Sequence, residues 1–151
     1  MLSHRVAAAI EVLFSATPRP CLLLVSAELT VLQAQAERLQ ARCPRLQVGA
    51  LLSTALLHVA PRQRPQAARR WWDAQLVSYA PEPVLCTHID LLFTPELALD
   101  PVQLFRQLGR ITPLIVCWPG RYQDQVLSYA VPEHAHYRTW RHPEVEILLL
   151  A

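Results

Sequence analysis

The chain contains no lysine, and only three of its 151 residues are glycine. Because Gly49, Gly109 and Gly120 lie far apart, no stretch can form the glycine-rich loop that cradles phosphate in nucleotide-binding proteins. All 14 basic residues are therefore arginines, and the 13 prolines far outnumber the glycines. We expect the turns to be built from proline, serine, aspartate and polar pairs. These absences exclude an ordinary phosphate-binding loop.

The sequence also lacks a cysteine motif and a membrane-spanning run. No apolar run approaches the ~20 residues that a helix needs to cross a bilayer. Glu11 interrupts the apolar stretch near the N-terminus, so we interpret this stretch as an amphipathic helix rather than a signal peptide. The expected location is the cytoplasm. The four cysteines form no Cys-x-x-Cys pair and most lie in apolar runs, which predicts buried thiols rather than a disulfide or a zinc site. They are Cys21, Cys43, Cys86 and Cys117.

What remains is an apolar chain of modest charge. Hydrophobic residues make up 52% and charged residues 17%, which excludes a disordered chain. The length predicts a single domain over residues 1–151 with a substantial core. A net charge of +2 neither favours nor excludes a nucleic-acid partner. The high apolar content favours a protein partner or a homo-oligomer.

The hydrophobic pattern alternates strands with helices, which predicts an α/β fold with a mainly parallel central sheet. Continuous apolar runs are typical of strands buried on both faces. Pro119-Gly120 predicts a turn, and Asp100-Pro101 predicts the start of a helix that ends near Gly109. The expected strands are 21–25, 46–48, 84–87, 113–118, 126–130 and 146–150, and the other expected helices are 1–14, 29–42, 51–59 and 66–79.

The second half of the chain resembles one protein family. The residues that carry the resemblance are His88-Ile-Asp-Leu-Leu-Phe-Thr-Pro-Glu-Leu, Leu99-Asp-Pro, Gly109-Arg110, Val116-Cys-Trp-Pro-Gly, Leu127-Ser-Tyr-Ala, Pro132, His134 and Tyr137-Arg138. The family is BrxF, the small P-loop protein of type III BREX bacteriophage-exclusion systems. The first half of the chain is similar to that family only in its order of strands and helices. The resemblance implies a P-loop NTPase-like, three-layer α/β domain that works beside other phage-defence proteins.

The phosphate-binding motif of that family is missing here. A P-loop reads Gly-x-x-x-x-Gly-Lys-[Ser/Thr] and directly follows the first strand. With the motif placed after the strand at 21–25, Ser26 and Val31 stand at the two glycines. Leu32 then stands at the lysine that contacts the β- and γ-phosphates, and Gln33 at the hydroxyl that binds the metal.

The metal-binding end of the second strand is altered too. The resemblance puts an acidic residue where this chain has Thr87, and Asp90 takes the place of the family's glutamate three residues further on. Loss of both motifs implies a degenerate, non-catalytic member without a cofactor. We therefore expect an adaptor or scaffold that binds partner proteins of a BREX-like defence system.

Two further functions stay open. A rearranged site around Asp90, His88 and Arg110 would make the chain a nucleotide-binding protein or a weak ATPase. The opposing interpretation of Asp90 is a helix-capping or loop carboxylate. His134 and His136 have a metal-like spacing, but His134 also belongs to the family's tail pattern, which favours a structural role.

Arginines beside tryptophans give a third candidate surface. In this interpretation the chain is an accessory subunit that contacts nucleic acid. The contact is made by Arg69-Arg70-Trp71-Trp72 together with Arg106 and Arg110. At helical spacing, however, Trp72 begins an apolar stripe that predicts core packing. A partner interface formed by Arg69, Arg70, Trp71 and Arg110 is the remaining interpretation, because tryptophan and arginine are enriched at interface hot spots. Arg110 could equally form a structural ion pair.

Overall fold

The computed structural model describes residues 3–15 and 20–150, and within them the strands form one mostly parallel sheet. Five strands follow the order β2-β3-β4-β1-β7, and every neighbouring pair among them is parallel. The remaining two continue from β4 as an antiparallel ribbon. The strands are β1 (Cys21–Ser26), β2 (Arg45–Gln47), β3 (Val84–Thr87), β4 (Leu114–Gln123), β5 (Val126–Tyr129), β6 (Arg138–Arg141) and β7 (Glu146–Leu149).

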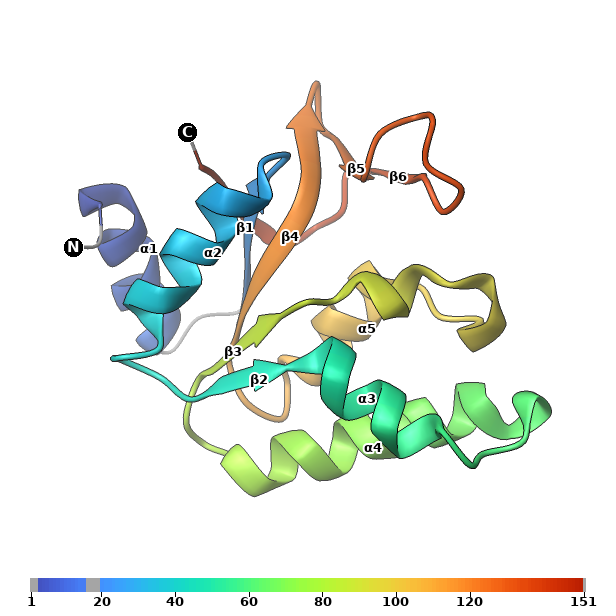
Figure 1. Cartoon of the computed structure of the whole chain (residues 1–151). Coiled ribbons are helices and arrows are strands. Elements are labelled where there is room, and N and C mark those ends of the chain that lie inside the picture. The colour runs from blue at the N-terminus through green and yellow to red at the C-terminus, as the bar shows by residue number, and fades with distance from the viewer. Residues whose placement is uncertain (1–2, 16–19, 151) are drawn as a thin grey trace.

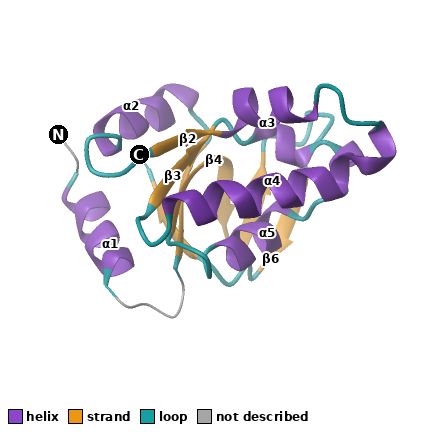
Figure 2. Cartoon of the chain, turned by 90° about the horizontal axis from the view of Figure 1, so that it is seen from below, coloured by secondary structure: helices purple, strands orange, loops and turns teal. Residues whose placement is uncertain are grey.

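Helices cover both faces of the sheet, which confirms the predicted three-layer α/β fold (Figures 1 and 2). One face carries α1 and α2, and the other carries α3, α4 and α5. No helix in the described part of the chain is long and apolar enough to cross a membrane. The helices are α1 (His4–Phe14), α2 (Leu29–Leu39), α3 (Val48–Leu56), α4 (Arg64–Tyr79) and α5 (Pro101–Leu108).

The strand β1 contributes side chains to both halves of the core. All its residues are buried, as the continuous apolar run predicts. Leu22 and Leu24 pack with α1 and α2, whereas Leu23 and Val25 pack with the helices of the opposite face. This alternation follows from the two-residue period of a strand. The strand order places β1 between β4, the middle strand of the five, and the edge strand β7.

All four cysteines are buried and free, as predicted. Burial raises the pKa of Cys21 and of Cys117 to about 12. It also raises the pKa of Cys43 and, strongly, that of Cys86. Because the thiolate is the reactive form, these side chains act as small apolar core residues.

The predicted boundary between β2 and α3 was wrong. Val48 is not the end of a strand but the first residue of α3, and this helix ends at Leu56. The helix follows the strand without a loop because Gly49 allows a close approach. A Cβ on Gly49 would lie 3.1 Å from the backbone carbonyl oxygen of His88. The predicted strand ended at 48 and the predicted helix began at 51, whereas Gly49 lies inside α3.

The predicted turn at Pro119-Gly120 was also wrong. β4 runs through both residues to Gln123 and pairs with β5. The chain turns instead at Asp124 and Gln125, whose φ values of 53° and 62° suit a tight hairpin turn. Gly120 is needed because a Cβ there would overlap the carbonyl group of Ser128 on β5. The strand β6, which pairs with β5, was not predicted.

The N-terminal half of α5 confirms the Asp100-Pro101 signal. The Asp100 carboxylate accepts a hydrogen bond from the Gln103 amide at 3.1 Å, and Pro101 is the first helical residue. Gly109 follows the helix with an ordinary helical φ of −59°. A Cβ on Gly109 would lie 3.0 Å from the Pro20 carbonyl oxygen, so this glycine lets α5 end close to the start of β1. Of the predicted helix 1–14, residues 1–2 lie outside the described chain.

Candidate functional site

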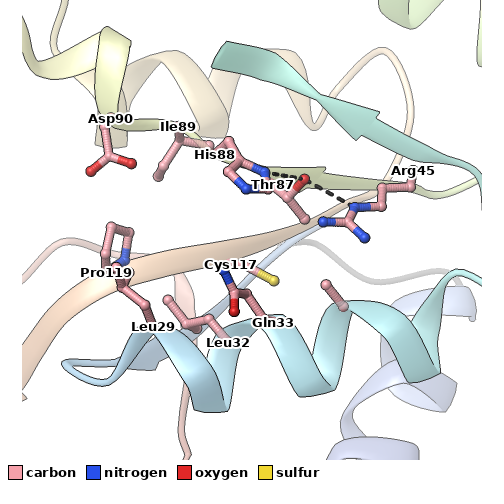
Figure 3. Close-up of a pocket in the computed structure, with 11 residues that line it drawn as sticks. Leu29, Leu32, Gln33, Arg45, Thr87, His88, Ile89, Asp90, Cys117 and Pro119 are labelled. Atoms are coloured by element: carbon pink, nitrogen blue, oxygen red, sulfur yellow. Dashed lines mark hydrogen bonds between the residues drawn. The ribbon is translucent and has the colours of Figure 1, made fainter. Parts of the chain in front are cut away.

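A cavity of about 100 Å³ lies at the carboxyl edge of the parallel strands, between α2 and the ends of β3 and β4 (Figure 3). Ligands of α/β proteins bind at this edge of the sheet, where crossovers leave toward opposite faces. Here the crossover after β1 contains α2, on one face, and the crossover after β3 contains α5, on the other. The lining residues are Leu29, Leu32, Gln33, Ala36, Arg45, Thr87, His88, Ile89, Asp90, Cys117 and Pro119.

The turn between β1 and α2 is closed by the chain's own groups. Only Ala27 and Glu28 separate the strand from the helix. The Ser26 hydroxyl accepts a hydrogen bond from the Glu28 amide at 3.1 Å. A phosphate-binding nest needs such amides free and pointing toward the anion. The exposed Glu28 also puts a carboxylate at the positive end of α2, where it repels a phosphate.

The next predicted motif positions lie on α2 itself. Leu32 is buried and packs with Leu24 and Ala36 in the core between α2 and the sheet. Val31 is half-buried, and Gln33 is exposed at the mouth of the cavity. The position of the motif lysine is therefore filled by a core leucine. The geometry offers no cation there for a β- or γ-phosphate.

Thr87 ends β3 and connects two side chains at the cavity. Arg45 Nε donates a hydrogen bond to the Thr87 hydroxyl at 3.2 Å, and His88 Nδ1 lies 3.2 Å from the same oxygen. His88 has a φ of 55°, a left-handed conformation that turns the chain out of the strand. Thr87 thus has its hydroxyl in contact with two neighbouring side chains. Figure 3 shows Arg45 beside it at one end of the cavity.

Asp90 lies at the other end of the cavity and is tied to the antiparallel ribbon (Figure 3). The Tyr129 hydroxyl on β5 donates a hydrogen bond of 2.5 Å to Asp90 Oδ1. The Tyr129 ring stacks on Phe93, with ring centroids 3.6 Å apart. Burial, and then the Asp90 hydrogen bond, raise the pKa of Tyr129 well above its usual value. Asp90 makes no helix-capping bond and instead anchors the ribbon to the segment after β3.

Removal of this anchor gives a first prediction. Tyr129→Phe keeps the ring stack but removes the hydroxyl, so we expect a loss of about 1 kcal/mol in unfolding free energy. The loss stays small because Asp90 is exposed and can be hydrated. Because the folded state raises the pKa of Tyr129, the wild-type advantage is present below pH ~10 and declines as the pH rises above it.

Urea denaturation of both proteins at pH 7 and at pH 11 measures this difference. As a matched control, Tyr122→Phe removes a half-buried hydroxyl from β4 without touching Asp90. Equal stability of the Tyr129→Phe variant and the wild type at pH 7 would contradict the anchoring role.

Arg110 does not join Asp90 and His88. It lies in the turn between α5 and β4, at the amino edge of the sheet, where Gly109 lies against Pro20. Asp90 and His88 lie at the carboxyl edge, after β3. The structure therefore does not assemble the rearranged site that the sequence suggested. Arg110 is exposed at the opposite end of the sheet.

The tryptophan–arginine segment divides between core and surface on α4. Trp72 is fully buried, which confirms the predicted core stripe, and it packs edge-on against Trp71 with centroids 5.0 Å apart. Trp71 is half-buried, while Arg69 and Arg70 are exposed. Arg69 faces α5 across a shallow hollow. Arg106, which the nucleic-acid interpretation also uses, pairs with Glu144 at 3.2 Å.

The two histidines with metal-like spacing interact with the protein and with each other. The His136 amide donates a hydrogen bond of 2.9 Å to His134 Nδ1, which leaves only Nε2 of that ring for a metal. The His134 ring packs edge-on against Tyr129, with centroids 5.5 Å apart. Within residues 3–15 and 20–150, no group of three or more His, Cys, Asp or Glu side chains is placed to hold a metal ion.

Sequence reasoning missed Arg45, Cys117 and Pro119 as cavity residues. Arg45 starts a short edge strand, and its side chain reaches Thr87 from 42 positions away in the sequence. Pro119 was assigned to a turn, although it lies within β4 opposite Ser26. The motif positions after the first and second buried strands located Leu32, Gln33, Thr87, His88 and Asp90, but they gave no signal for these three residues.

Comparison with known proteins identified no family model, no curated protein and no solved structure that matches the chain.

Proposed function

We propose that the chain is a non-catalytic, degenerate P-loop-fold protein that serves as an adaptor or scaffold in a bacterial anti-phage system of the BREX type. The family assignment rests on the sequence resemblance to BrxF. We place the protein in the cytoplasm, with other defence proteins as its partners. In P-loop proteins the phosphate loop joins a strand to the helix that follows it, and β1, the turn and α2 correspond to that unit in this proposal.

One observation carries the non-catalytic part of the proposal. The Ser26 hydroxyl binds the Glu28 amide, and Leu32 packs into the core where a phosphate-binding lysine would extend. Phosphoryl transfer depends on positioned cations and amides around the transferred group. This turn has no lysine, glycine or free nest, and it presents a carboxylate instead. A nucleoside triphosphate bound at this turn would meet the Glu28 carboxylate, and the turn itself supplies no cation to offset that repulsion.

The surface of α4 supports the adaptor part. Arg69 and Arg70 are exposed beside the half-buried Trp71. Among the described residues no carboxylate forms an ion pair with either arginine. Arginine and tryptophan contribute most to hot spots in protein interfaces, and arginine binds carboxylates through two parallel hydrogen bonds. We propose this surface as the docking surface for an acidic region of a partner, with the exposed Arg110 after α5 as a further contact.

Co-purification tests the adaptor role. The tagged chain is expressed in its native host as wild type, as Arg69→Glu/Arg70→Glu and as Arg38→Glu, in which the altered arginine is exposed on α2 of the opposite face. We expect proteins of a phage-defence system to co-purify at a constant ratio with the wild type and the Arg38→Glu control. The double variant should lose them, because two repulsive charges replace two attractive ones. Capture of no defence protein by the wild type would contradict the adaptor role, and equal capture by all three would contradict the interface.

A further inference from the structure

We propose that the cavity beside α2 binds a small monocarboxylic acid with a compact apolar body, and that Arg45 holds the carboxylate. This site does not depend on the adaptor role.

Arg45 is a half-buried cation whose charge is not balanced by the described residues. Its Nε donates to Thr87 at 3.2 Å and its Nη1 donates to Gln40 Oε1 at 3.4 Å. No carboxylate of the described chain forms an ion pair with it. A guanidinium has five N–H donors, so several remain for a ligand. A partly buried charge gains most from an opposite charge, and a carboxylate fits the guanidinium fork.

Two contacts hold the guanidinium in place before a ligand arrives. Thr87 is almost fully buried at the end of β3, and Gln40 follows α2. The nearby Cys117 does not supply the missing anion, because burial raises its pKa to about 12 and keeps the thiol neutral. A fixed donor group loses little conformational entropy on binding. Arg45 is therefore positioned as an anion receptor.

Apolar side chains form most of the remaining wall. Figure 3 shows Leu29 and Leu32 below the cavity and Ile89 above it, between Arg45 at one end and Asp90 at the other. The volume of about 100 Å³ is smaller than the ~150 Å³ of an apolar cavity that holds benzene, so it accommodates a carboxylate with only a short apolar body. A short branched hydrocarbon body, whose end can lie at the mouth of the cavity, suits this space. Burial of such a body contributes ~25 cal/mol per Å² of apolar surface.

The charges at the far end exclude polyanions. Asp90 lies at the other end of the cavity, and Glu28 lies at the start of α2. A diphosphate or triphosphate that reached Arg45 would place further negative charge near these carboxylates. A ligand with one negative charge at one end and a neutral body avoids this repulsion. The charge pattern thus separates a monocarboxylate from a nucleotide.

Titration with sodium 4-methylpentanoate, followed by amide NMR, tests the proposal. The neutral 4-methylpentanamide and inorganic phosphate serve as ligand controls. We expect saturable binding of the carboxylate below about 20 mM, a range in which a Kd near 1 mM is measurable. The shifted amides should include Leu32, Thr87 and His88. The amide analogue and phosphate should bind at least about tenfold more weakly.

Variants assign the binding to Arg45. Arg45→Gln should weaken binding of the carboxylate at least about tenfold, whereas Arg38→Gln on the outer side of α2 should leave it unchanged. If Arg45→Gln does not fold, Gln33→Trp provides the test, because Gln33 is exposed at the cavity mouth and an indole there should block entry. Unchanged binding in the folded variant, equal binding of the amide analogue, or no saturable binding to wild type would overturn the proposal.

Discussion

Trp118→Ala is expected to lower the free energy of unfolding by about 3–5 kcal/mol, the largest effect we predict for a single substitution. Trp118 is fully buried near the end of the β4 segment that pairs with β1. Its ring packs edge-on against Phe93 at 5.1 Å and against Trp140 at 5.4 Å. Its Nε1 donates a hydrogen bond of 2.9 Å to the Ser128 carbonyl oxygen. Alanine would leave a cavity and an unsatisfied carbonyl in one step.

A domain of this size has a total stability of about 5–15 kcal/mol, so the variant should be close to unfolding. Guanidinium denaturation measures the change, and loss of near-ultraviolet circular dichroism reports the aromatic cluster. Trp118→Phe is the matched control, since it keeps most of the packing and loses the N–H donor. We expect that control to lose about 1–3 kcal/mol. A loss below about 1 kcal/mol in the alanine variant would show that Trp118 does not hold the ribbon in place.

Gly120→Ala is expected to cost about 2–4 kcal/mol, because the added methyl has no space. A Cβ at Gly120 would overlap the Ser128 carbonyl oxygen and lie 2.9 Å from its carbonyl carbon. Both are backbone atoms of β5, so the clash can be relieved only by opening the β4–β5 pairing. The ribbon carries Tyr129, so the Asp90 hydrogen bond should be weakened as well.

Gly49→Ala is the matched control for this effect. Its Cβ would lie 3.1 Å from the His88 carbonyl oxygen, a tight contact without overlap. The substitution also gains up to about 1 kcal/mol of helix propensity, because Gly49 lies within α3. Thermal and urea unfolding should therefore show a much larger loss for Gly120→Ala than for Gly49→Ala. Equal losses would refute the steric explanation.

The layers of the fold could be predicted because the buried strands are continuous apolar runs. The apolar composition of 21–25 and 84–87 indicates strands inside a parallel sheet. The structure agrees, because Cys21–Ser26 and Val84–Thr87 are buried at every position. The strand Arg138–Arg141 was missed because its residues are only half-buried or exposed. Its pairing with β5, rather than its apolar content, makes it a strand.

The extension of β4 through Pro119 was missed for a different reason. Pro-Gly normally indicates a turn. Here Pro119 lies at the last pair of the β1–β4 ladder, where a missing amide hydrogen costs little. The Pro119 carbonyl instead accepts a hydrogen bond from the Ala130 amide at 3.1 Å, next to β5. The pairing of β4 with β5 therefore decides the local structure here, rather than the turn preference of the Pro-Gly pair.

The sequence predicts several of the residues at or near the cavity, but not the side chains that contact them. The positions Ser26, Leu32, Thr87 and Asp90 follow from the order of strands and helices. Their partners do not, because Arg45 reaches Thr87 across 42 positions and Tyr129 reaches Asp90 across 39. Such contacts depend on strand register and on side-chain direction. The absence of lysine from the chain and of glycine from this turn, in contrast, is evident from the sequence, and the hydrogen bond that closes the turn at Ser26 is its structural counterpart.

Isothermal titration with ATP, ADP and GTP, with and without magnesium, tests the central claim most directly. The claim is that the turn between β1 and α2 cannot hold a phosphate. The Ser26 hydroxyl already accepts the Glu28 amide hydrogen, and the core residue Leu32 stands at the position of the motif lysine. We predict no saturable heat of binding for any of the nucleotides under either condition. Micromolar binding of any one of them, with or without the metal, would contradict the claim.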